Sequence, residues 1–216
     1  MNILKIDPFK PEPHLLRKAA EVILNDGVIG YPTETVYGLG ANAESDTAVE
    51  KVFRLKGRDQ SKPILVIASN MRQILNMADT VPPEAETLAK RYWPGALTII
   101  FRAKATVNKR LLGNGQSIGI RIPDNRICLK LIEICNRPLT STSANETGGA
   151  NPLSAAEVND NFGNRLDLII DGGIASSRIA STVLDLTDKN PVLRRAGRIS
   201  KQDIEQTIKR EIYESI

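Results

Sequence analysis

The sequence predicts one α/β domain in which helices flank a twisted sheet of mixed parallel and antiparallel strands. Short apolar runs that suit buried strands alternate with amphipathic stretches that suit helices along the 216 residues. No repeat period, low-complexity tract or linker interrupts this alternation. The expected strands 166–170 and 182–186 are too close in sequence for a helical crossover, so we expect part of the sheet to be antiparallel. This length suits a single domain, which we place at 1–216.

The first half of the chain contains three expected helices, each with a recognisable start or stop. The helix at 14–25 has a broad apolar face and is followed by Gly27, a residue type common at helix ends. The helix at 47–55 follows two candidate capping residues at 45–46, and the helix at 83–92 begins with a proline. The apolar runs expected to form strands in this half are 3–6, 28–31, 64–67 and 97–101.

The second half continues the same alternation. Helices are expected at 126–135 and 154–162, and a closing amphipathic helix at 200–212. The strands expected in this half are 118–122, 166–170, 182–186 and 192–195.

The composition excludes several classes of protein. Apolar residues make up 41% of the chain and charged residues 25%, and no apolar run is long enough to cross a membrane. The N-terminus lacks the pattern of a secretion signal, and Cys128 and Cys135 are spaced along one expected helix, so we expect reduced cysteines in a cytoplasmic protein. A single histidine, His14, leaves no basis for histidine-dependent catalysis. The net charge of +4 permits binding of phosphates or RNA without requiring either.

The segment YPTETVYGLG at 31–40 is the first candidate for chemistry. An apolar strand runs directly into a proline, two threonines and a glutamate, which offer hydroxyls and backbone donors at a sheet edge. Such edges commonly bind ligands in α/β proteins. An ordinary turn with Gly38 and Gly40 at special backbone angles is the structural alternative.

The segment KGRDQSKP at 56–63 places three cations on a loop between a helix and a strand. Lysine supplies a compact charge and arginine a bidentate fork, so the loop suits a polyphosphate. A solvated basic loop remains the alternative. The chain contains no G-x-x-x-x-G-K-[ST] phosphate loop and no G-x-G-x-x-G after a strand.

The segment STSANETGG at 141–149 follows an expected strand and combines hydroxyls, an amide and a glycine pair. This composition can hold an anion through backbone donors, although a capped polar loop explains it equally well. Arg121 and the arginine pair 194–195 add cations at strand ends. Together these segments favour chemistry by positioning and charge stabilisation, as in phosphoryl or nucleotidyl transfer.

Eight segments, in order along nearly the whole chain, resemble the YrdC-like family. The resemblance implies an α/β fold of the YrdC-like (RibB-like) type with a basic concave pocket. The combined K-x-R and S-x-N pattern is similar to that of the threonylcarbamoyl-AMP synthases of this family, and some paralogues lack it. The segments are YPTETVYGLG (31–40), KGR (56–58), WPGALT (93–98), IGIRIP (118–123), STSAN (141–145), DLIIDGG (167–173), ASTVLDL (180–186) and VLRRAG (192–197).

The resemblance implies a role for each polar residue at the strand ends. The catalytic residues, which would hold the ATP phosphates and complete the nucleotide site, are expected to be Lys56, Arg58, Ser143 and Asn145. Further nucleotide contacts are expected from Ser117, Asn151 and Arg195. The residues expected to bind L-threonine are Thr33, Arg121, Ser141 and Ser181, with the arginine pairing with its carboxylate.

The implied reaction joins L-threonine, bicarbonate or CO₂, and ATP into L-threonylcarbamoyladenylate, with release of pyrophosphate. Mg²⁺ is expected to arrive with ATP, and no tightly bound protein metal site is expected. The expected partners are the transferases that use the adenylate to make N6-threonylcarbamoyladenosine (t6A) at position 37 of tRNA. Long family members carry an additional C-terminal domain, whereas this chain ends soon after the YrdC-like unit.

Two alternatives stay open. One is a paralogue with different acyl-adenylate chemistry. The other is a non-catalytic protein that binds double-stranded RNA or tRNA in the same basic concavity. Four Phe, four Tyr and one Trp, without an interleaved basic–aromatic motif, argue against readout of single-stranded RNA.

Overall fold

The computed structural model describes residues 2–175 and 178–214. Its α-helices are α1 (Pro13–Leu24), α2 (Asp46–Lys56), α3 (Met71–Met77), α4 (Pro83–Tyr92), α5 (Arg126–Cys135), α6 (Ala155–Phe162) and α7 (Lys201–Ile208), and its short 3₁₀ helices are η1 (Lys109–Leu112) and η2 (Gly163–Arg165). Its strands are β1 (Ile3–Lys5), β2 (Ile29–Tyr31), β3 (Gly38–Gly40), β4 (Val66–Ile67), β5 (Leu97–Arg102), β6 (Ser117–Arg121), β7 (Leu139–Thr140), β8 (Thr142–Ser143), β9 (Leu168–Asp171), β10 (Thr182–Asp185), β11 (Val192–Arg195) and β12 (Tyr213–Glu214).

The predicted class, a mixed α/β fold with helices around twisted strands, is confirmed, but the described strands form two sheets where we expected one. The five-stranded sheet has the order β1-β9-β2-β3-β8, and the seven-stranded sheet has the order β12-β11-β10-β5-β6-β4-β7. Both sheets contain parallel and antiparallel pairs. For example, β2 pairs with β9 in parallel and with β3 antiparallel, while β5 pairs with β10 in parallel and with β6 antiparallel.

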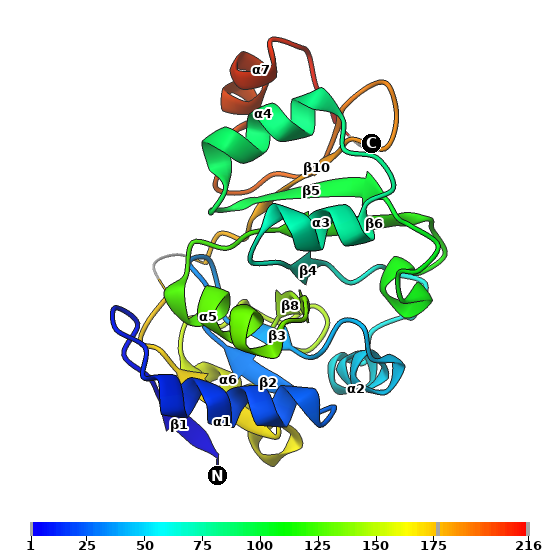
Figure 1. Ribbon diagram of the computed structural model, residues 1–216. Helices are drawn as coiled ribbons and strands as arrows, with labels where there is room; N and C mark the ends of the chain where they lie inside the picture. The colour runs from blue at the N-terminus through cyan, green and yellow to red at the C-terminus, as the bar shows by residue number, and fades with distance from the viewer. Residues whose placement is uncertain (1, 176–177, 215–216) are drawn as a thin grey trace.

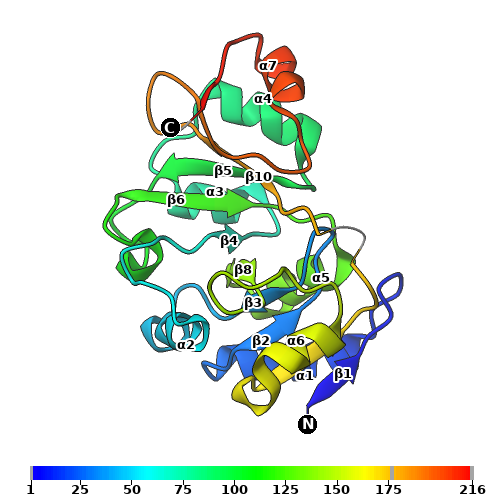
Figure 2. The same ribbon diagram turned by 180° about the vertical axis from the view of Figure 1, so that it is seen from behind.

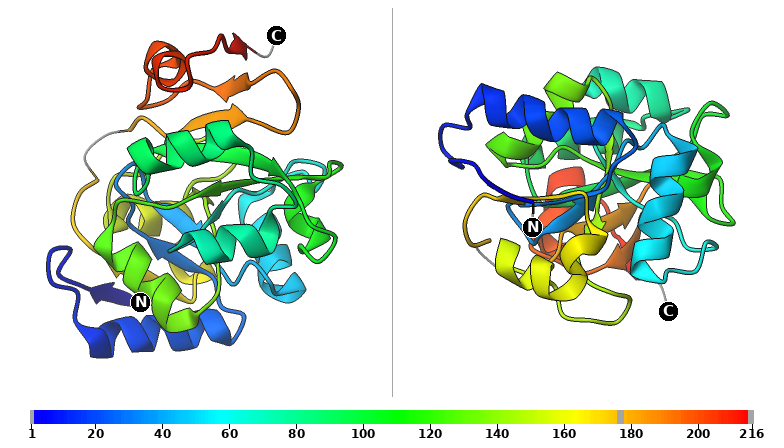
Figure 3. Two further views of the ribbon diagram at one scale, coloured as in Figure 1. Left: turned by 45° about the horizontal axis from the view of Figure 1, so that its top comes forward. Right: turned by 90° about the horizontal axis from the view of Figure 1, so that it is seen from below.

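Helices cover both faces of the five-stranded sheet. α1 and α5 pack together on one face (Figure 1), and α6 lies on the opposite face, as the view from behind shows (Figure 2). Successive side chains of a strand point to opposite faces of the sheet, and β9 shows this alternation. Leu168 and Ile170 join the core beneath α1 and α5, while Ile169 joins the core that contains α6. At the other end of the molecule, α4 packs against α7 (Figure 1), and the strands β10 and β11 lie close to them (Figure 3).

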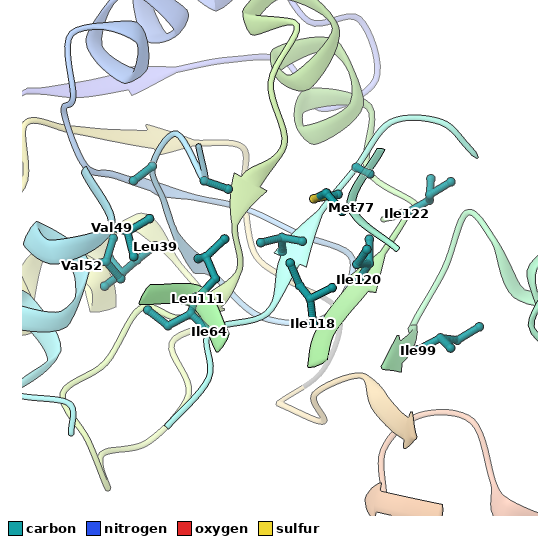
Figure 4. Packing of buried hydrophobic residues seen from close by; sticks show 14 of the residues in the cluster. Leu39, Val49, Val52, Ile64, Met77, Ile99, Leu111, Ile118, Ile120 and Ile122 are labelled. Carbon is teal, nitrogen blue, oxygen red and sulfur yellow. The ribbon is translucent and has the colours of Figure 1, made fainter. Parts of the chain in front are cut away.

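A continuous apolar core joins the two sheets. Leu39 of β3 and Val49 of α2 belong to the same buried cluster as Ile118 and Ile120 of β6 (Figure 4). These side chains are 0% exposed, so the packing holds the two sheets in a fixed relation. This matters for function because the candidate site draws residues from both sheets.

The expected antiparallel neighbours 166–170 and 182–186 are not paired with each other. β9 lies in the five-stranded sheet and β10 in the seven-stranded sheet, where β10 is parallel to β5. A short separation in sequence did not require the two strands to be neighbours.

Three local features differ from what the sequence predicted. The helix expected to reach 212 ends at Ile208, because Lys209 adopts a left-handed conformation with φ of 53° and β12 then pairs with β11. α3 was missed; it is seven residues long and is capped by Asn70, whose side chain accepts from the backbone of Gln73. The glycines of 38–40 lie in β3, antiparallel to β2, and an added Cβ at Gly40 would lie 2.8 Å from the ring of Tyr31.

In the described part of the chain, no helix combines the length and the apolar character needed to cross a membrane.

Candidate functional site

A pocket of about 300 Å³ is lined by residues from both sheets. Four cations line it, and none of its described lining residues is a carboxylate, histidine or cysteine. Such an excess of positive charge suits an anionic ligand. The pocket is lined by Thr33, Thr35, Val36, Gly38, Lys56, Arg58, Pro63, Ile64, Leu65, Val66, Thr98, Arg121, Ser141, Thr142, Ser143, Asn145, Thr147, Gly148, Asn151, Ala180, Ser181 and Arg195.

Lys56 is the last residue of α2, and it is only 4% exposed. Its Nζ donates to the backbone oxygens of Ser143 (2.6 Å) and Asn145 (2.7 Å). An ammonium group has three N–H donors, so one remains for a ligand. Burial, reinforced by the nearby charge of Arg58, lowers the pKa of Lys56 to about 8.

The loop after β8 also binds back to the end of α2. Thr147 donates to the backbone oxygen of Lys56 through both its amide (3.3 Å) and its hydroxyl (3.0 Å). Together with the two bonds from Lys56 Nζ, these contacts join the K-x-R loop to the S-x-N loop. The two segments that sequence analysis selected separately therefore form one structural unit.

Two polar atoms in this unit are buried without a hydrogen-bond partner among the described residues. The Asn145 side chain donates through Nδ2 to Gly149, but its Oδ1 has no partner. Arg58 donates through Nη2 to the backbone oxygen of Pro63 (2.9 Å), but its Nε has none. Buried polar atoms are normally paired, so an unpaired acceptor and an unpaired donor at one pocket indicate a site that a polar ligand completes. Burial also lowers the pKa of the Arg58 guanidinium, an effect that Asp59 opposes.

A second group of polar residues lies where β6 and β11 end. Arg121 donates from Nη1 to Glu34 Oε1 at 2.5 Å and to Thr35 Oγ1 at 3.5 Å. Arg195 donates to the backbone oxygen and the hydroxyl of Ser181, both at 3.0 Å. This group therefore adds two guanidinium cations to the charge of Lys56 and Arg58.

The structure places ten of the eleven predicted site residues in this pocket, and Ser117 is not among its lining residues. Ser117 and Arg121 begin and end β6 and share one face by the two-residue period. Gly119 lies between them, and the side chain of Leu65 covers it, since an added Cβ there would lie 2.4 Å from Leu65 Cδ2. Leu65 thus separates Ser117 from the Arg121 end of the strand.

Thr33 lines the pocket, but its hydroxyl bonds within its own turn. It accepts from the amides of Thr35 and Val36 and donates to the backbone oxygen of Val36 at 2.7 Å. Asn151 also lines the pocket, and Arg178 donates to its backbone oxygen at 2.7 Å.

Five polar residues of this site were not among the predicted ones. Thr35, Thr98, Thr142 and Thr147 line the pocket, and Glu34 lies behind Arg121. Glu34 and Thr35 lie inside the 31–40 segment, so the segment was predicted to be functional but these two residues were not assigned roles. Thr98 bonds to the Ser181 hydroxyl at 2.9 Å, a contact across 83 residues that no local pattern signals.

Comparisons with known proteins give consistent results. The family model for Sua5, YciO and YrdC proteins, described as "Telomere recombination", matches residues 21–197. A protein of Pyrococcus abyssi (strain GE5 / Orsay) named threonylcarbamoyl-AMP synthase is 40% identical over 193 residues, which cover 89% of this chain and 57% of the relative. A protein of the same name from Bacillus subtilis (strain 168) is 38% identical over 194 residues, which cover 89% of this chain and 56% of the relative. The chain thus spans little more than half the length of these two relatives.

Solved structures of similar proteins share the fold. The crystal structure of P. abyssi Sua5 complexed with L-threonine is 38% identical with a TM-score of 0.94, over 99% of this chain and 63% of that chain. The crystal structure of E. coli YciO is 30% identical with a TM-score of 0.87, over 94% of this chain and 100% of that chain.

Proposed function

The chain belongs to the Sua5, YciO and YrdC family, and we propose that it is a threonylcarbamoyl-AMP synthase. The proposed reaction combines L-threonine, bicarbonate and ATP into L-threonylcarbamoyladenylate, pyrophosphate and water. Two relatives that carry this name are 38–40% identical over 89% of the chain. The observation that carries the proposal is the pocket itself, in which Lys56, Arg58 and Asn145 converge from two loops. Two of its buried polar atoms, Arg58 Nε and Asn145 Oδ1, have no hydrogen-bond partner among the described residues.

In this proposal, the loops after α2 and around β8 hold the polyphosphate. Lys56 has one N–H donor left after its two backbone contacts, and Arg58 has an unpaired Nε. Asn145 Oδ1 is the matching unpaired acceptor. We assign nucleotide contacts to Lys56, Arg58, Ser143 and Asn145, with Asn151 and Arg195 as outer contacts. Ser117, which does not line the pocket, would contact only a nucleotide that extends past Leu65.

The amino acid would occupy the other end of the pocket. Arg121 is 4% exposed and lies at the end of β6, where it can pair with the carboxylate of L-threonine. Thr33, Ser141 and Ser181 complete the proposed threonine site. A Sua5 of P. abyssi has been solved in complex with L-threonine, which supports an amino-acid ligand for this fold.

Catalysis in this arrangement depends on positioning and charge. The amine of threonine takes up bicarbonate to give a carbamate and water. A carbamate oxygen then attacks the α-phosphorus of ATP, the bond to the bridging oxygen breaks, and pyrophosphate leaves in line. Lys56 and Arg58 would stabilise the negative charge that develops on the phosphates.

We propose that Mg²⁺ enters this site together with ATP. Among the described residues, no group of three or more His, Cys, Asp or Glu side chains could hold a metal ion. When bound with the nucleotide, Mg²⁺ supplies further neutralisation of phosphate charge. The phosphate oxygens themselves would be its main ligands.

The adenylate would be the product delivered to other proteins. We propose that transferases take it up to form t6A at position 37 of tRNA, and that the protein works in the cytoplasm. Direct contact with tRNA or double-stranded RNA remains part of this proposal, because the pocket is basic.

A product assay tests the proposal directly. Purified protein supplied with ATP, L-threonine and bicarbonate should release pyrophosphate, and mass spectrometry should detect the adenylate. Omission of either threonine or bicarbonate should abolish release. A protein that binds tRNA but forms no adenylate would contradict the enzyme assignment and favour RNA binding. A product from another amino acid would favour a paralogue with different acyl chemistry.

ATP binding should weaken as pH rises through the pKa of Lys56. This pKa is about 8 in the ligand-free site, and deprotonation removes a charge-assisted hydrogen bond to phosphate. We expect the Kd for ATP to rise about tenfold to a hundredfold between one pH unit below and about two units above this value. Calorimetric titration across this range measures the effect. Lys56→Ala should bind ATP weakly with a flat profile, and an equally steep profile in that variant would refute the assignment.

A further inference from the structure

We propose that Glu34 is a positioning residue that holds one corner of the Arg121 guanidinium, so that the rest of the group faces the carboxylate of an amino-acid substrate. The identity of that carboxylate rests on the proposed function. Arg121 lines the pocket and Glu34 is not among its lining residues, so Glu34 acts from behind the arginine.

The ion pair of Arg121 and Glu34 is largely buried, and a single nitrogen of the arginine makes its contacts. The side chains of Arg121 and Glu34 are 5% and 15% exposed. Within the described part of the chain, the side-chain hydrogen bonds of Arg121 all run through Nη1, to Glu34 Oε1 and Thr35 Oγ1. A guanidinium has five N–H donors in a planar fork. The donors on Nε and Nη2 therefore remain for a carboxylate, which arginine binds with two parallel bonds.

The direction of the hydroxyl hydrogen bonds explains why Thr35 supports the same corner. The hydroxyl of Thr33 has one hydrogen and donates it to the backbone oxygen of Val36. The contact between the Thr33 and Thr35 hydroxyls, at 2.9 Å, must then use the hydrogen of Thr35. Thr35 Oγ1 is left as an acceptor, which suits the N–H of Arg121 at 3.5 Å.

Glu34 is itself held in place. Arg198 donates from Nη1 to its backbone oxygen at 2.7 Å, and the turn formed by Thr33 and Val36 encloses it. The carboxylate also offsets a like-charge contact, because Arg195 lines the same pocket and is close enough to Arg121 for repulsion. Loss of the Glu34 charge would allow Arg121 to rotate or to turn toward another anion.

Steady-state kinetics of Glu34→Gln test the proposal. The variant keeps the size of the side chain and removes its charge. We expect the KM for L-threonine to rise about tenfold or more, with the KM for ATP changed less than about twofold. Glu34→Asp keeps the charge on a shorter side chain and should recover part of the loss. An equal rise in both KM values, or no change in either, would overturn the proposal.

Glu84→Gln is the matched control. Glu84 accepts from Arg210 at 2.8 Å in a pair that is 28% and 34% exposed and does not line the pocket. This variant removes an Arg–Glu pair of the same chemistry, so its KM values should equal those of the unmodified protein. A rise in its KM for threonine would show that the effect of Glu34 is only structural.

Side-chain NMR of ligand-free protein separates this inference from the proposed function. In the unmodified protein, the Arg121 guanidinium should give slowly rotating, hydrogen-bonded N–H signals, and Glu34→Gln should broaden or average them. If no adenylate forms with any variant, the proposed reaction fails while these signals still report on positioning. Identical Arg121 signals in both proteins would overturn the role of Glu34.

Discussion

Replacing Lys56 with alanine is expected to lower the rate of pyrophosphate release by about 10²–10³-fold. The ammonium supplies charge to the phosphates, and its donors to Ser143 and Asn145 also hold the second phosphate loop in place. The variant therefore loses both the charge and the loop geometry. Initial rates at saturating ATP and threonine measure the effect.

The fold of this variant should survive with reduced stability. Removal of Nζ leaves the backbone oxygen of Asn145 without its donor, while the oxygen of Ser143 still accepts from the amide of Asn145 at 2.9 Å. The loss costs roughly 1–3 kcal/mol where water cannot replace the donor. Denaturant unfolding measures this cost. Lys51→Ala is the control, because Lys51 lies on the same helix, is exposed and donates to the backbone oxygen of Asp26. Unchanged turnover in Lys56→Ala, with ATP bound normally, would contradict the phosphate role.

Replacing Gly197 with alanine is expected to destabilise the protein strongly. An added Cβ would lie 2.4 Å from the amide nitrogen of Thr182, 2.5 Å from the carbonyl carbon of Ser181 and 2.6 Å from the backbone oxygen of Ala180. These are backbone atoms, so no side chain can move aside. We expect a loss of stability of about 1–3 kcal/mol or more from the forced separation of the two segments.

The same substitution should also weaken amino-acid binding. Arg195 lies two residues before Gly197 and donates to both oxygens of Ser181, which lines the pocket. Separation of the two segments would pull Arg195 away from Ser181, so the KM for threonine should rise in the fraction that folds. Gly115→Ala is the control, because the nearest atom to its added Cβ is 3.4 Å away and the site is exposed. A normal melting temperature for Gly197→Ala would contradict the predicted clash.

Much of the fold was predictable because most elements carry strong local patterns. The helices at 126–135 and 83–92 lie at the residues predicted for them. α3 was not predicted because a seven-residue helix is too short to show a clear apolar period. Residues 209–212 were predicted to be helical because the amphipathic pattern continues beyond Lys209, whose left-handed conformation ends the helix.

The candidate site was predictable as a set of segments. The 56–58 and 141–145 segments do meet, and ten of the eleven named residues line one pocket. Glu34 and Thr98 were not identified because their partners, Arg121 and Ser181, lie 87 and 83 residues away in sequence. Ser117 was assigned to the site because of the family resemblance. Ser117 and Arg121 lie on the same strand, but the side chain of Leu65 packs between them and Ser117 does not line the pocket.

The sequence by itself determined the α/β class, the family resemblance and the segments that supply cations and hydroxyls. It could do so because period, caps and motifs are properties of neighbouring residues. Only the tertiary structure decided that the strands form two sheets, that Lys56 is clamped between two carbonyls, and that Glu34 occupies one corner of Arg121. These features depend on which distant segments the buried core brings together, and on how that burial changes charge and hydrogen bonding.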